Sequence, residues 1–222
     1  MTDPNNRRIF NYRKALLPNS HLASLEKGVR DIETAKRKTG FSIGYPGWNL
    51  LYYSVLCSMD RTNENIIIET GTNWGCSTIV LGQALKDSGL RGHVYSVEID
   101  PGNVKRAKAN IRKAGVSSYI TVVCDDSIAY LKKFLKEVER ISFAFLDGCH
   151  SESHVVKEFS LIHPKLRDKG IVYFDNIADV RVPGEGRRVY GALRKIMDKY
   201  GGNIIKFENV SWSTPGQAMW QK

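Results

Sequence analysis

The chain has 222 residues, of which 42% are hydrophobic, and it carries a formal net charge of +10 at pH 7. This length and apolar content predict one sizeable core. No stretch approaches the roughly 20 apolar residues of a membrane span. We therefore expect no membrane partner, no signal peptide and a cytoplasmic location. The four cysteines lack a Cys-x-x-Cys pair, which disfavours both a zinc site and a disulfide framework.

The positive charge is concentrated towards the N-terminus. The first 50 residues contain nine Lys or Arg against four acids, which is half of the net excess. Such a charge indicates either an anionic partner or a solvated surface that keeps the protein soluble. Both alternatives stay open at this point.

The N-terminal segment predicts a helical extension over residues 1–60. Residues 1–19 show little periodicity, and we expect them to be loosely ordered. Apolar residues at helical spacing over 20–38 predict one amphipathic helix that docks on the rest of the chain. The apolar segment 48–59 predicts a second helix that is mostly buried.

From residue 66 onward, short apolar runs alternate with helix-length segments, which is typical of βα units around a mostly parallel sheet. This pattern predicts one α/β domain over 61–222. The predicted strands are 66–69, 93–98, 119–124, 142–147, 170–175 and 203–207, and an antiparallel strand returns over 218–221. The predicted helices, 77–87, 103–115, 127–138, 152–168 and 186–200, would cover both faces of the seven-stranded sheet.

The first predicted strand, 66–69, ends in an acid and opens into a turn that contains Gly71 and Gly75. These glycines let the backbone approach a ligand closely, and Ser77 could cap the next helix. The order Glu-x-Gly-x-x-x-Gly-x-Ser resembles the first motif of the class I, Rossmann-like S-adenosylmethionine-dependent methyltransferases. A dinucleotide-binding fingerprint would instead need glycine at Asn73. An ordinary strand-to-helix turn is the alternative.

Acidic residues follow strand after strand in this sequence. In open α/β sheets, ligands bind outside the carboxyl ends of the strands, so these acids are expected to face one crevice. They are Glu69, Glu98, Asp125 or Asp126, Asp147 and Asp175.

The resemblance to the methyltransferases implies a site for the methyl donor. Glu98 would accept hydrogen bonds from two ribose hydroxyls. Asp126 would face the adenine or cap the helix that begins at Ser127. The extension over 1–60 would lie over the ligand end of the sheet as a substrate cap. The implied donor-binding residues are Glu69, Gly71, Thr72, Asn73, Trp74, Gly75, Ser77, Glu98, Asp126, Ser127 and Asp147.

The ends of the fourth and fifth strands carry a sharper pattern, Leu-Asp-Gly-Cys-His and Phe-Asp-Asn. They resemble the metal-dependent O-methyltransferases related to catechol and caffeoyl-CoA methyltransferases, and those that methylate sugars of natural products. The resemblance implies that Asp147, Asp175 and Asn176 hold one Mg²⁺ or Mn²⁺ through oxygen atoms, which hard cations prefer. The alternative is that the two aspartates only cap the helices that follow them.

His150 stands where several sugar-methylating relatives have a histidine. The resemblance therefore implies that His150 is the base that takes a proton from the acceptor hydroxyl. His154 and His163 are rival candidates. The loop 181–188, which carries three arginines, would either clamp a carboxylate or phosphate of the substrate or remain solvated.

These patterns predict an S-adenosylmethionine- and metal-dependent O-methyltransferase. Its acceptor would be a hydroxyl of a small molecule, such as a sugar, a polyol or a phenolic natural product. The sequence leaves open whether this acceptor is anionic and whether the protein forms a homo-oligomer. A nucleic-acid methyltransferase is an alternative, favoured by the charge but disfavoured because Asp147 is not followed by Pro-Pro-Tyr. A non-catalytic module that binds RNA or protein is a second alternative, disfavoured because the donor and metal acids are present.

Overall fold

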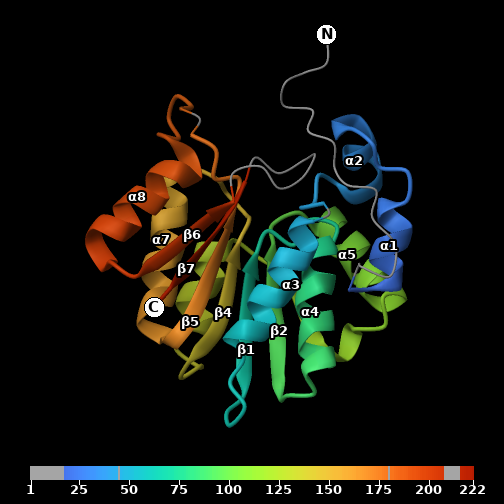
Figure 1. Ribbon diagram of the computed structural model, residues 1–222, viewed down its shortest axis with the longest axis horizontal. Coiled ribbons are helices and arrows are strands. Elements are labelled where there is room, and N and C mark those ends of the chain that lie inside the picture. The colour runs from blue at the N-terminus through green and yellow to red at the C-terminus, as the bar shows by residue number, and fades with distance from the viewer. Residues whose placement is uncertain (1–17, 45, 180, 208–215) are drawn as a thin grey trace.

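The computed structural model describes residues 18–44, 46–179, 181–207 and 216–222, and these contain a seven-stranded sheet (Figure 1). The strands lie in the order β3-β2-β1-β4-β5-β7-β6. The pairs that β7 forms with β5 and β6 are antiparallel, and the other pairs are parallel. This confirms the predicted α/β sheet. The strands are β1 (Asn65–Thr70), β2 (Gly92–Glu98), β3 (Ile120–Cys124), β4 (Ile141–Leu146), β5 (Leu166–Asp175), β6 (Asn203–Phe207) and β7 (Gln217–Gln221). The expectation for residues 1–19 falls mostly outside the described residues.

Helices cover both faces of the sheet, as predicted. Side chains alternate along each strand, so Ile67 and Phe143 face one helical layer while Ile68 and Ala144 face the other. The first layer contains α3 (Gly47–Ser58), α4 (Cys76–Ser88) and α5 (Pro101–Lys113). The second contains α6 (Ser127–Phe134), α7 (Glu152–Ile162) and α8 (Arg188–Tyr200) (Figure 1).

The prediction of one continuous helix over 20–38 is wrong. The structure has two helices, α1 (Ser20–Glu26) and α2 (Ile32–Thr39). Gly28, at φ +80°, interrupts the helical backbone, and the Asp31 carboxylate accepts the Thr34 N–H at 2.7 Å to start a new helix. Because of this break, Ile32 does not pack against the rest of the chain as expected, and it is 54% exposed.

Helix α3 is buried on one side only, although we expected it to be mostly buried. Trp48, Leu51 and Val55 are fully buried, whereas Tyr53 is 61% exposed. The helix lies beside α4 and contacts β4 and β5 directly. It is therefore part of the layer that covers the sheet. The division of the chain into 1–60 and 61–222 stays a prediction.

The predicted helix over 152–168 ends early, at Ile162. Pro164 follows in a single 3-10 turn, because proline has no N–H to continue an α-helix, and β5 already begins at Leu166. Helix α6 also ends before position 138, at Phe134. Within the described residues, no helix has both the length and the apolar character needed to cross a bilayer.

Candidate functional site

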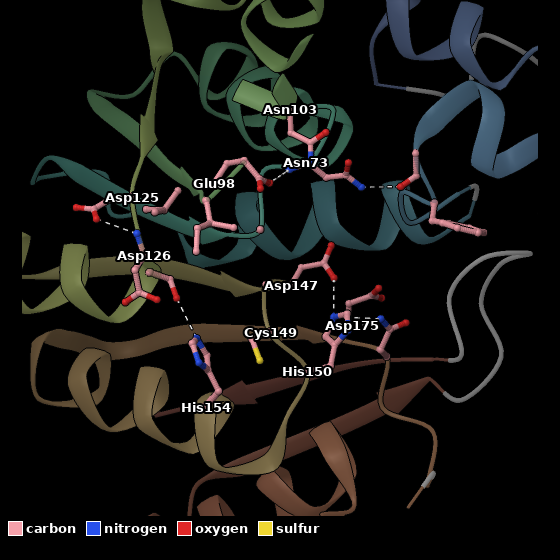
Figure 2. Close-up of a pocket in the computed structure, with 18 of the residues that line it drawn as sticks. Asn73, Glu98, Asn103, Asp125, Asp126, Asp147, Cys149, His150, His154 and Asp175 are labelled. Carbon is pink, nitrogen blue, oxygen red and sulfur yellow. Dashed lines mark hydrogen bonds and ion pairs between the residues drawn. The ribbon is translucent and has the colours of Figure 1, made fainter. Parts of the chain in front are cut away.

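A cavity of about 840 Å³ opens at the carboxyl ends of the parallel strands (Figure 2). Its volume is in the range of small-molecule sites. Residues from the ends of β2 and β5 and from the turns that follow β1, β2, β3 and β4 line it, together with Gly40 and Phe41 from the segment after α2. Of the crevice acids predicted from the sequence, Glu98, Asp125, Asp126, Asp147 and Asp175 line this cavity.

The turn between β1 and α4 requires a glycine at position 71. Gly71 has φ +88°, and a Cβ atom there would lie 2.2 Å from the carbonyl oxygen of Asp147. The backbone of this turn therefore packs directly on the end of β4. Further along the turn, the Asn73 N–H donates to Glu98 Oε2 at 2.7 Å. Gly71 and Asn73 both line the cavity, as expected.

Two backbone N–H groups hold the carboxylate of Glu98. Besides the Asn73 bond, Glu98 Oε1 accepts the Asp100 N–H at 2.9 Å. A carboxylate has about four acceptor positions, so each oxygen keeps one for a ligand. The neighbouring acid has another task, because Asp100 Oδ1 accepts the Asn103 N–H at 2.7 Å and caps α5.

Glu69 does not face the crevice, and this part of the prediction is wrong. It shares the side of β1 that carries Ile67 beneath α4, and it is fully buried. Its carboxyl group accepts the hydroxyls of Thr78 and Ser96, both at 2.5 Å. Burial raises the Glu69 pKa, and these hydroxyl donors oppose the rise. Glu69 therefore has a structural role, because it links β1 to α4 and β2 through these hydrogen bonds.

Four further residues of the predicted donor site lie outside the cavity lining. Trp74 packs against Gly40 and beneath Arg106, whose guanidinium carbon is 3.9 Å from the ring centroid. Thr72 contacts the Ser96 hydroxyl at 2.5 Å. Ser77 does not cap α4, because the helix begins one residue earlier with Gly75 as its N-cap. The predicted donor residues that do line the cavity are Gly71, Asn73, Glu98, Asp126, Ser127 and Asp147.

Asp126 caps α6, one of the two roles considered for it, by accepting the Ala129 N–H at 2.8 Å, and it also lines the cavity. The next residue, Ser127, lies 3.0 Å from His154 Nε2. That ring also lies 3.3 Å from the carboxylate of Glu158, which is 1% exposed. The Glu158 hydrogen bond raises the His154 pKa despite burial. His154 is therefore held between Ser127 and Glu158.

Asp147 and Asp175 face each other at the centre of the cavity (Figure 2). Asp175 is only 3% exposed, and the side chain of Asp147 is 18% exposed. Burial raises both pKa values well above the usual range; Glu69 adds to the rise at Asp147, and Asp147 adds to it at Asp175. Neither aspartate caps a helix, because the N-caps of α7 and α8 are Ser151 and Arg187. The capping alternative is excluded.

The pair and Asn176 form a donor set that fits a hard cation. Asp175 Oδ1 is buried and has no hydrogen-bond partner among the described residues. A divalent ion would neutralise the two crowded carboxylates, whose pKa values are raised without it. No group of three or more His, Cys, Asp or Glu side chains in the described ranges is arranged as a metal site. The predicted ligands include only two side chains of these four types, Asp147 and Asp175, because the third ligand is the amide oxygen of Asn176.

His150 points at this pair (Figure 2). Its Nε2 lies 3.3 Å from Asp147 Oδ1 and 3.1 Å from Asn176 Nδ2. Burial lowers the His150 pKa, although the negative charge of Asp175 opposes the shift. The imidazole is therefore neutral at neutral pH. The rival His163 does not line the cavity and packs on the rings of Tyr200 and Trp220.

Comparison with known sequences identifies the family. The sequence profile of a family described as "Methyltransferase domain" matches residues 68–177. This range runs from β1 to just beyond β5 and contains the Gly71 turn, Glu98 and the Asp147–Asp175 pair. Residues 68–177 are a methyltransferase domain.

Two curated relatives of this methyltransferase are themselves named O-methyltransferases. The rhamnosyl O-methyltransferase of Mycobacterium bovis is 29% identical over 162 residues, which cover 69% of this chain and 61% of the relative. The protein-L-isoaspartate O-methyltransferase of Staphylothermus marinus is 39% identical over 70 residues, 31% of each chain. The chain spans less than two thirds of the length of either relative.

Solved structures share the fold of this methyltransferase. The O-methyltransferase from Bacillus cereus in complex with SAH superposes with a TM-score of 0.72 at 20% identity, over 91% of this chain and 90% of the other. At this identity, the likeness establishes the common fold.

Sequence reasoning missed several residues that line the cavity of the methyltransferase. Phe41, Ile99 and Asn103 lie outside the recognised motifs, and Cys149 lies inside one of them but was given no role. Phe41 adopts φ +63°, which is uncommon for an aromatic residue and has no signature in the sequence. Asn103 carried a weak signal, because it lies in the first turn of the helix that follows Glu98.

The three arginines of the 181–188 loop do not act as one clamp. Arg187 binds both carboxylate oxygens of Asp179 and lies over the ring of Tyr190. Arg181 is exposed and does not line the cavity. Arg188 does line it, and its Nε is 3.1 Å from Glu185. Any anion recognition by this loop therefore involves Arg188.

Proposed function

We propose that the protein transfers the methyl group of S-adenosylmethionine to a hydroxyl of a small molecule, and that it needs a divalent cation to do so. The observation that carries this proposal is the pair formed by Asp147 and the buried Asp175, which lies beside His150 and shares one cavity with Glu98. The names of the relatives support O-methyl transfer, and the SAH in the Bacillus cereus protein supports the donor.

The side of the cavity formed by β1, β2 and β3 would bind the methyl donor. The carboxylate of Glu98, held by two backbone N–H groups, would accept the two ribose hydroxyls. Gly71 would let the backbone approach the donor closely, and Asp126 with Ser127 would contact the adenine. Such contacts align the donor methyl with an acceptor in the second half of the cavity.

Asp147, Asp175 and Asn176 would hold Mg²⁺ or Mn²⁺ next to the acceptor. When bound, the cation would supply positive charge that makes an acceptor hydroxyl more acidic. The neutral imidazole of His150 would take the proton of that hydroxyl. The hydroxyl oxygen would then form a bond to the methyl carbon as the carbon–sulfur bond of the donor breaks, and S-adenosylhomocysteine would leave.

The acceptor class we propose is a sugar, a polyol or a phenolic natural product. Arg188 supports an acidic group on this acceptor, because its guanidinium group lies at the cavity. Gly40 and Phe41 support a role for the N-terminal segment as a substrate cap, since both line the same cavity. The free cysteines, Cys57, Cys76, Cys124 and Cys149, support a cytoplasmic location.

A methyl-transfer assay with radiolabelled S-adenosylmethionine and a panel of polyhydroxylated acceptors tests the proposal. We expect activity to stop in excess EDTA and to return with Mg²⁺ or Mn²⁺. Asp175→Asn should abolish Mn²⁺ binding in calorimetry while S-adenosylhomocysteine still binds. Asp179→Asn is the matched control, because this acid pairs with Arg187 outside the cavity and should leave metal binding unchanged. Full turnover in EDTA would show that the metal-dependent proposal is wrong.

A further inference from the structure

Cationic and apolar side chains gather on α2 and α5 beside the cavity mouth. We call this surface the α2–α5 rim and define it as Ile32, Lys36, Arg37, Phe41, Lys105 and Arg106, all of which are exposed. The two helices meet at Trp74. A Cβ at Gly40, just after α2, would lie 2.8 Å from the Trp74 ring, and Arg106 of α5 lies over that ring.

The apolar members of the rim are large and exposed. Ile32 is 54% exposed and Phe41 is 45% exposed. Ile32 and Lys36 are four residues apart on α2, so they share one side of the helix, and Lys36 Nζ lies 5.5 Å from the centroid of the Phe41 ring. Apolar side chains between Lys and Arg are typical of helices that lie in the interface of a membrane.

Cations outnumber acids on the two helices of the rim. Among the described residues, no ion pair within 4 Å engages Lys36, Arg37, Lys105 or Arg106, although Asp31 and Glu33 lie at the start of α2 and Asp31 interacts with Arg37. The α5 range Pro101–Lys113 contains five Lys or Arg and no Asp or Glu. The excess of positive charge on this surface is complementary to an anionic surface.

We propose that the α2–α5 rim docks on the headgroup surface of an anionic lipid bilayer. The cations would lie among the anionic headgroups, while Ile32 and Phe41 would enter the interfacial layer. Phe41 also lines the cavity, so docking would turn the cavity mouth towards the bilayer. The sequence-based expectation of no membrane partner depended on the lack of an apolar span, and surface docking needs none.

The composition of the rim favours a bilayer over a nucleic acid. Single-stranded nucleic acids are held by several aromatic side chains on which successive bases stack. The rim has one exposed aromatic residue, Phe41, and its other apolar member, Ile32, offers no ring for stacking. An aliphatic and an aromatic side chain among cations match the chemistry of a lipid interface better.

Cosedimentation of the full chain with vesicles tests the inference. Vesicles of pure phosphatidylcholine are compared with vesicles that contain about one quarter phosphatidylglycerol. We expect binding only to the anionic vesicles, and we expect it to weaken as salt rises. The double variant Lys36→Gln/Arg37→Gln should bind about thirtyfold more weakly, because each Lys or Arg at the headgroup surface contributes roughly fivefold. Ile32→Ser, which keeps the charge, should also weaken binding.

The matched control is Lys132→Gln/Lys133→Gln, which removes the same charge from exposed positions of α6 in the other helical layer. It should bind vesicles like the unmodified chain. If both double variants bound the vesicles equally weakly, net charge alone would explain the binding. That result would show that the rim is not the docking site. Tighter binding to a single-stranded RNA oligonucleotide than to vesicles, lost in the α2 variant, would also overturn it. Vesicle binding needs no methyl donor, so its failure is separate from failure of the proposed methyl transfer.

Discussion

Two histidines at the cavity have neighbours that shift their pKa values in opposite directions. Burial lowers the pKa of His150, whereas the hydrogen bond to Glu158 raises the pKa of His154. The neutral form of His150, which can accept a proton, is therefore favoured.

His150→Ala should lower kcat by a factor of about 10² to 10⁴, the usual contribution of a positioned general base. The affinities for S-adenosylhomocysteine and for Mn²⁺ should change little. Because the neutral imidazole is the active form and its pKa is lowered, the activity of the unmodified enzyme should fall only when the pH drops below the ordinary histidine range. This acid limb should vanish in the variant, which a pH–rate profile would show.

His154→Gln serves as the companion variant for this comparison. Since His154 lies against Ser127 and Glu158, we expect it to alter donor affinity and thermal stability while the acid limb persists. If His150→Ala retained full kcat and the acid limb instead disappeared in His154→Gln, the base would be His154.

At the scale of elements, Glu98 ties two strand-to-helix turns together. One oxygen accepts from the turn after β1 and the other from the turn after β2. Both turns line the half of the cavity in which we propose that the methyl donor binds. The carboxylate therefore positions the walls of this half as well as offering acceptors to a ligand.

Glu98→Ala should weaken S-adenosylhomocysteine binding by about 2 to 3 kcal/mol, because hydrogen bonds to a charged group are lost. Titration calorimetry measures this change. The control is Asp100→Ala, which removes the cap of α5 at a residue that does not itself line the cavity. It should lower stability by about 1 kcal/mol and leave the dissociation constant nearly unchanged. Equal effects on binding from the two variants would argue against a ribose contact by Glu98.

The strands and the crevice acids could be predicted from the sequence because both follow from local rules. Buried parallel strands appear as apolar runs, and their carboxyl ends meet at one edge of the sheet. The direction of Glu69 could not be predicted in this way. The strand is buried on both faces, so its apolar run does not show to which face the side chain of Glu69 turns.

The same local rules could not predict where a helix is interrupted or which residues far apart in the sequence come into contact. Leu22 and Ile32 both fit a single helical stripe, and only the Gly28 turn and the Asp31 cap separate them. Phe41 enters the cavity through an uncommon backbone conformation and through packing of Gly40 on Trp74, a residue more than 30 positions away. Such contacts depend on the tertiary fold.

At the scale of the whole molecule, the carboxylate pair links stability to pH and to metal. The folded chain raises the pKa values of Asp147 and Asp175 above those of the unfolded chain, so the folded state binds these protons more tightly. This contribution to stability is present in acid and is lost as the pH rises through the raised pKa values. The metal-free protein should therefore lose stability towards neutral pH at this site.

A divalent cation should reverse this loss, because it binds the ionised pair and not the protonated one. At about one hundred times its dissociation constant, Mg²⁺ would contribute about 2.7 kcal/mol, or about 5 to 10 °C in Tm for a chain of this size. Thermal melts in EDTA and in Mg²⁺, at about pH 5 and about pH 8, measure the effect. The Mg²⁺ shift should be large at the higher pH and small at the lower one. Asp147→Asn/Asp175→Asn should melt at the same temperature with and without Mg²⁺, which separates this site from other carboxylates that titrate in the same range. A Mg²⁺ shift of equal size at both pH values would place the cation elsewhere on the molecule.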